Sequence, residues 1–117
     1  MGTRVELRSS DPSCNPYLEM ALCLLAGLDG IERGLTPPES ITDNIFDMSD
    51  EERKADGIDS LPGSLEEAVN ELEKSDFCKE ALGDHVFKKF IEAKRKEWDG
   101  YRTSISQWEI DNYLARY

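Results

Sequence analysis

The sequence predicts a mostly α-helical chain that opens with a single β-strand, and three observations lead to this fold class. Residues 3–8 alternate charged with apolar side chains, which is the two-residue period of a half-buried strand. The stretch from Pro16 to Leu28 carries a single charged residue and repeats its leucines at helical spacing. Further along, the spacing Ser-x-x-Glu of a helix capping box starts at Ser49, Ser64 and Ser106.

The expected strand at residues 3–8 carries a row of alternating charges. In a strand, Arg4, Glu6 and Arg8 lie on one face, roughly 6.6 Å from one to the next. Such a row suits a site that holds a cation through Glu6 and anionic groups through the arginines. A solvated or salt-bridged face is the alternative. Because a lone strand needs a partner for its N–H and C=O groups, either the segment is disordered or its sheet lies upstream in a larger protein.

The next expected element is a helix over residues 15–33. Asn15 is suited to cap it, Pro16 to occupy its first position and Gly34 to end it. A helix that is apolar on nearly every side is usually buried against several neighbours. We therefore expect residues 15–33 to form the core helix of the chain.

The sequence predicts that the remainder consists of a connector over residues 35–63 and a helical subdomain with a tail over residues 64–117. The connector contains Pro37-Pro38 and one short helix, which should begin after Ser49 and end near Ala55. The subdomain should contain helices that start at the other two capping boxes, and a long amphipathic helix between them.

The composition excludes several classes of partner. The chain of 117 residues has a formal net charge of −11, which argues against binding nucleic acid and against an anionic membrane surface. Its three cysteines form neither a disulfide framework nor a zinc motif. The longest apolar run is too short to span a bilayer, and no secretory pattern opens the chain. These features predict a cytoplasmic protein with reduced thiols.

Several blocks of the sequence closely resemble type I (bacterial) glutamine synthetase. They include Arg4-Val-Glu-Leu-Arg8, Asp11-Pro-Ser-Cys-Asn-Pro-Tyr-Leu18 and Ala26-Gly-Leu-Asp-Gly-Ile31. The resemblance continues, in the family's order, through Asp43-Asn-Ile-Phe-Asp47, the segment 61–68 and Glu97-Trp-Asp-Gly-Tyr-Arg102. Because family members are far longer, the chain resembles the C-terminal segment of the catalytic domain, with residues 3–8 as an active-site strand orphaned from a larger α+β domain.

The resemblance implies an enzyme that ligates ammonia to glutamate with ATP, through γ-glutamyl phosphate and with Mg²⁺ or Mn²⁺. In the family pattern, Glu6 matches a metal ligand. Arg8 matches a catalytic arginine that binds substrate glutamate, and Arg4 lies toward the nucleotide. The resemblance further implies a dodecamer of two rings that is joined through the C-terminal helix. With only one of the metal-ligand carboxylates present, the 117-residue chain alone should be inactive.

Two alternatives to a catalytic segment remain open at this point. The chain could be a stand-alone helical interaction module, or its surface could dock nitrogen-regulatory proteins. The charged row discriminates between these readings, since a pure interaction module has no need for Arg4, Glu6 and Arg8 at this spacing.

Overall fold

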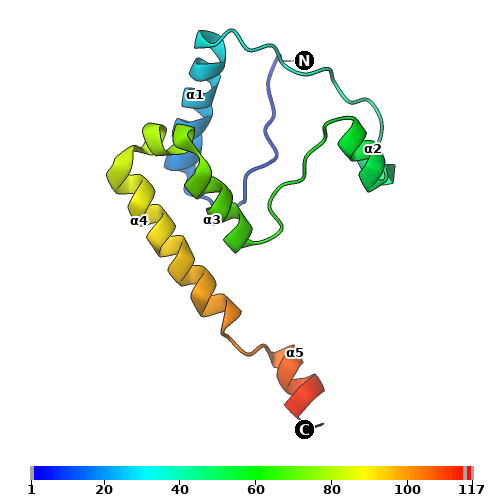
Figure 1. Ribbon diagram of the computed structural model, residues 1–117, viewed down its shortest axis with the longest axis vertical. Helices are drawn as coiled ribbons and strands as arrows, with labels where there is room; N and C mark the ends of the chain where they lie inside the picture. The colour runs from blue at the N-terminus through cyan, green and yellow to red at the C-terminus, as the bar shows by residue number, and fades with distance from the viewer. Residues whose placement is uncertain (1, 115, 117) are drawn as a thin grey trace. The chain divides into compact units, whose positions relative to one another are not determined.

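The computed structural model describes residues 2–114 and 116, and it divides into two compact units, Met1–Pro62 and Gly63–Tyr117 (Figure 1). The first unit contains helix α1 (Pro16–Glu32), the 3₁₀ helix η1 (Ile45–Asp47) and helix α2 (Asp50–Ala55). The second contains α3 (Leu65–Lys74), α4 (Asp76–Arg102), α5 (Gln107–Glu109) and the π-helix η2 (Ile110–Leu114). None of the helices in the described residues is both long and apolar enough to cross a membrane.

The prediction of an N-terminal strand is wrong. Residues 3–8 are coil, and the described part of the chain contains helices but no strand. The physical reason is the absence of a neighbouring strand: alternation fixes which side chains share a face, but a ladder needs a second backbone. Val5 is 97% exposed and Leu7 is also exposed, so neither apolar side chain of this segment is covered.

Helix α1 has the ends that the sequence predicts. The side chain of Asn15 accepts hydrogen bonds from the backbone N–H groups of Tyr17 and Leu18, at 3.0 and 3.4 Å. At the other end, Gly34 has φ 61°. Its N–H donates to the carbonyl of Ile31, and the Leu35 N–H donates to the carbonyl of Gly30. These two bonds form a Schellman motif, and glycine takes the required left-handed conformation without strain.

The expectation that this helix forms the core is wrong for the chain as described. None of its residues is buried, although its composition is the most apolar of any helix here. The sequence pattern predicts that the helix needs cover, but it does not say which segment provides that cover.

The connector is an irregular segment that is interrupted by two short helices. Helix α2 has a complete capping box: the Glu52 N–H donates to Ser49 Oγ at 3.2 Å, and the Ser49 N–H donates to Glu52 Oε2 at 2.7 Å. It ends at Ala55, before Gly57, as the sequence predicts. The local signals were sufficient here because a cap involves residues only three apart.

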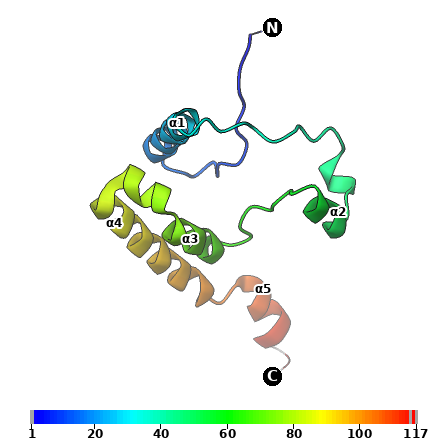
Figure 2. The same cartoon turned by 45° about the horizontal axis from the view of Figure 1, so that its top comes forward.

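In the second unit, α3 and α4 lie side by side (Figure 2) and enclose the small core of the chain. Val69, Phe87 and Ile91 are its buried residues, with 2%, 6% and 8% of their surface exposed. Arg95 of α4 also reaches α3, where its guanidinium donates to Asn70 Oδ1 at 3.1 Å and pairs with Glu73. Gly83 interrupts α4 with non-helical φ 71° and ψ 154°, a positive φ that glycine adopts without strain.

The tail helix begins at the third capping box. The Ser106 N–H donates to Glu109 Oε2 at 2.7 Å, and the Glu109 N–H donates to Ser106 Oγ at 3.2 Å. Within the tail, the rings of Trp108 and Tyr113 meet edge to face with centroids 5.5 Å apart. The tail is therefore ordered by local bonds, and most of its apolar surface stays exposed.

The cap at Ser106 predicts a pH dependence. The hydrogen bond from the Ser106 backbone, followed by that from its hydroxyl, lowers the pKa of Glu109. A lowered folded-state pKa stabilises the helix above the unfolded pKa of about 4.3, and this contribution is lost as the pH falls through the folded pKa. We expect an NMR titration of the Glu109 carboxyl to have a lower midpoint than that of an uncapped glutamate. A Ser106→Ala variant keeps the backbone N–H, which is the larger cause of the lowered pKa, and loses only the hydroxyl, so it should move the midpoint part of the way back up. A Glu109 midpoint in the unmodified chain that is no lower than that of the uncapped glutamate would contradict the cap.

Candidate functional site

The charged row lies on the coil that precedes α1, and two of its three members meet. Arg8 Nε donates to Glu6 Oε1 at 2.6 Å. Their side chains are 84% and 51% exposed, respectively. Arg4 is exposed and joins no ion pair among the described residues. The structure thus brings Glu6 and Arg8 together, as expected for residues two apart, and leaves Arg4 apart from the pair.

An ion pair this exposed contributes little to stability, because water already solvates both charges. Little free energy is therefore lost when Glu6 or Arg8 leaves the ion pair to bind another group. Arg8 keeps a planar fork of donors for a carboxylate or phosphoryl group, and Glu6 keeps oxygen ligands of the kind that hard divalent ions prefer. The pair can act in binding, provided that other groups complete the site.

The chain does not complete a metal site by itself. Within residues 2–114 and 116, no group of three or more His, Cys, Asp or Glu side chains is placed to hold a metal ion. Glu6 fits the donor chemistry of Mg²⁺ or Mn²⁺ but supplies only one carboxylate. The chain therefore supplies the right type of ligand for such an ion, but too few ligands to bind it alone.

A tight turn connects the charged row to α1. The Cys14 N–H donates to the carbonyl of Asp11 at 3.0 Å, and the Ser13 N–H donates to the Asp11 side chain at 2.7 Å. The Cys14 thiol donates to Glu19 Oε2 at 2.9 Å. This hydrogen bond raises the pKa of Cys14, mainly because Glu19 accepts the thiol proton, and it lowers the pKa of Glu19. The Cys14 thiol therefore links the turn to the first turn of α1 through its hydrogen bond to Glu19.

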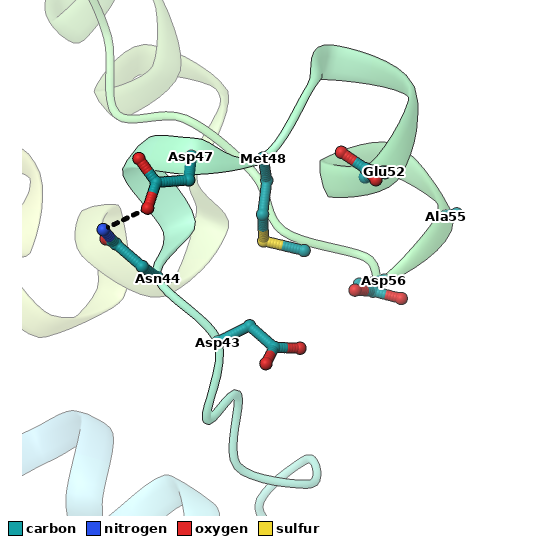
Figure 3. Close-up of a pocket in the computed structure, with 7 residues that line it drawn as sticks. All are labelled: Asp43, Asn44, Asp47, Met48, Glu52, Ala55 and Asp56. Atoms are coloured by element: carbon teal, nitrogen blue, oxygen red, sulfur yellow. Dashed lines mark hydrogen bonds between the residues drawn. The ribbon is translucent and has the colours of Figure 1, made fainter.

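A surface hollow that no sequence pattern predicts lies around η1 and α2 (Figure 3). It is lined by Asp43, Asn44, Asp47, Met48, Glu52, Ala55 and Asp56. Two of its four carboxylates have structural partners: Asp47 accepts a hydrogen bond from the Asn44 amide at 2.7 Å, and Glu52 caps α2. No residue of the charged row lines it. Acidic residues in the first turn of a helix, as Glu52 is here, ordinarily serve such local roles.

Comparison with known proteins identifies the family. Residues 1–113 match the family described as "Glutamine synthetase, catalytic domain". The chain belongs to this family. It is 53% identical over 116 residues to a glutamine synthetase of Clostridium saccharobutylicum, and 53% identical over 117 residues to one of Thermus thermophilus. The glutamine synthetase of Staphylococcus aureus is 46% identical over 117 residues.

These relatives are much longer than the chain. The matches cover 99–100% of the chain, but only 26% of each relative. The resemblance to glutamine synthetase that the sequence motifs indicated is thus confirmed over the whole chain, coil and helices alike. The reading as a stand-alone helical interaction module finds no support in these matches.

Proposed function

We propose that the chain is the C-terminal part of a cytoplasmic glutamine synthetase, which ligates ammonia to glutamate with ATP through γ-glutamyl phosphate. One observation carries the proposal: about half of all residues are identical to those of glutamine synthetases along the entire chain. The charged row at the start of the match adds the residue types that this chemistry uses.

In this proposal, Arg8 is the catalytic residue of the chain. Its guanidinium binds the substrate glutamate and balances negative charge on the phosphoryl group as it is transferred. Arg4 lies toward the nucleotide. The exposure of both side chains supports these roles, because neither arginine is committed to a buried structural contact.

Glu6 contributes one carboxylate to a site for Mg²⁺ or Mn²⁺, with the remaining ligands outside this chain. When bound, the ion would neutralise phosphate charge. The part played by the chain is to hold the Glu6 oxygens next to Arg8, at the 2.6 Å separation seen here, until substrate and ion replace the pair.

The same proposal includes a homo-oligomer, a dodecamer of two rings joined through the C-terminal helix. Its support is the exposed apolar surface of the tail, where Ile105, Trp108 and Leu114 are 76%, 62% and 76% exposed. Apolar and aromatic side chains of this kind are typical of the centre of subunit interfaces.

A chimera tests the proposed function. The Clostridium saccharobutylicum protein matches this chain over 116 residues, so the chain can replace that segment. The chimera should form glutamine from glutamate, ammonia and ATP at a rate within about tenfold of the parent's rate. A tenfold change corresponds to about 1.4 kcal/mol in the activation barrier. The isolated 117-residue chain should form none. A well-folded chimera without activity, or an active isolated chain, would refute the proposal.

A further inference from the structure

The dipeptide Asp-Gly occurs three times in the chain, at Asp29-Gly30, Asp56-Gly57 and Asp99-Gly100. In such a dipeptide the glycine nitrogen can attack the aspartate Cγ, because glycine has no side chain to obstruct the approach. The first two dipeptides are both followed by isoleucine, so their sequences agree from the aspartate onward. A difference in reactivity between these two therefore comes mainly from the structure around them.

The dipeptides in α1 and α4 are held in two ways. Gly30 and Gly100 lie inside their helices, where the N–H groups belong to the helical hydrogen-bond ladder. The carboxylate of Asp29 accepts a hydrogen bond from Arg33 at 3.0 Å, and that of Asp99 accepts one from Arg102 at 2.7 Å. A reaction at either dipeptide has to open helical backbone bonds and release an ion pair.

The dipeptide Asp56-Gly57 follows the last residue of α2 (Figure 3). Gly57 has φ 68°, and its N–H donates to the carbonyl of Lys54 at 3.2 Å. Asp56 is exposed, and its carboxylate forms no ion pair or hydrogen bond within residues 2–114 and 116. Because α2 has only six residues and none of them is buried, its last turn opens at little cost in free energy.

We propose that Asp56-Gly57 is a site of spontaneous succinimide formation and conversion to isoaspartate. The Gly57 nitrogen forms a bond to Asp56 Cγ, the bond from Cγ to the carboxyl hydroxyl breaks, and this hydroxyl leaves as water with the nitrogen proton. The ring places the nitrogen on the same side of the Asp56 Cα–C bond as Cβ, so ψ has to leave its value of 3° and the cap has to open. One water then adds at the backbone carbonyl of residue 56 and breaks its bond to the nitrogen, which leaves isoaspartate with no net change in atoms.

The modification changes the end of α2. Isoaspartate directs the main chain through Cβ and Cγ of residue 56, which lengthens the backbone by one carbon and leaves a free carboxylate on Cα. The N–H groups of Gly57 and Ile58 then lose the register in which they donate to the carbonyls of Lys54 and Arg53, at 3.2 and 2.8 Å. The helix loses its C-terminal cap, and the course of the connector toward α3 changes.

The test is incubation of the 117-residue chain at neutral pH in water labelled with heavy oxygen, followed by digestion in ordinary water. Trypsin cuts after lysine and arginine, so the three dipeptides fall on separate peptides. Each succinimide that is hydrolysed retains one heavy oxygen, and fragmentation in a mass spectrometer locates it. We expect label and isoaspartate to accumulate at Asp56 about tenfold faster than at Asp29 or Asp99, because only Asp56-Gly57 reacts without opening a helix interior.

Urea provides the matched control. In the unfolded chain, Asp29 and Asp56 should take up label at similar rates, because their local sequences agree. Asp56→Glu should abolish uptake at position 56, since a glutamate would have to close a larger ring, and it should leave the other two dipeptides unchanged. Equal rates at Asp29 and Asp56 in the folded chain, or a difference between them that persists in urea, would overturn the proposal. The measurement needs no enzymatic activity, so its outcome is independent of the proposed function.

Discussion

Replacing Phe87 with alanine should unfold the α3–α4 unit of the isolated chain. Phe87 is 6% exposed and packs with Val69 and Ile91, which are the other buried residues of the described chain. Truncating a buried phenylalanine costs about 3–5 kcal/mol. Small domains bury a low fraction of their surface, and total stabilities of about 5–15 kcal/mol are the norm for larger ones. The loss is therefore comparable to everything that holds this unit together.

The measurement is urea unfolding of the isolated chain, followed by circular dichroism and by tryptophan fluorescence, to which Trp98 on the same helix contributes. Val86→Ala is the control, because Val86 neighbours Phe87 in the sequence but is 40% exposed. It should shift the midpoint only slightly. Equal shifts for the two variants would show that the contact between α3 and α4 is not the core.

The position of this core shows what hydrophobic pattern can and cannot predict. The run from Pro16 to Leu28 is more apolar than any segment of α3 or α4, yet it contains no buried residue. The hydrophobic pattern of a helix indicates how much apolar surface the helix can bury. Whether that surface is buried depends on a partner segment, which can be far away in sequence or absent from the chain. The pair α3 and α4 is adjacent in sequence, so each helix supplies the cover for the other.

The same distinction explains the outcome at the helix ends and at the site. The caps at Asn15, Ser49 and Ser106 were predicted correctly because each involves atoms only a few residues apart. The strand over residues 3–8 was wrong because its ladder would require a second backbone segment. For the site, spacing alone predicted that Glu6 and Arg8 share a face, and they meet at 2.6 Å. In the proposed function, the ligands of these two residues also contact groups outside this chain, and no local pattern in it could predict those groups.

In the chimera with the Clostridium saccharobutylicum protein, Arg8→Ala should lower kcat for glutamine formation by about 10²–10³, as removal of a group that stabilises developing charge typically does. Arg8→Lys should recover only part of this loss, because an ammonium keeps the charge but cannot form the bidentate contact of a guanidinium. The KM for glutamate should rise in both variants. Stability should change little, since the only ion pair of Arg8 in the described chain joins it to Glu6 and is solvent-exposed.

Arg33→Ala provides the control for this experiment. Arg33 also forms an exposed ion pair, with its guanidinium 3.0 Å from Asp29 Oδ2 and its side chain 63% exposed. Its loss removes the same charge and a comparable contact, but from the end of α1 and outside the charged row. It should leave kcat within about threefold of the unmodified chimera, a difference of less than 1 kcal/mol in the barrier. Similar kcat values for Arg8→Ala and Arg33→Ala would remove Arg8 from the catalytic machinery, because charge loss alone would then account for the effect.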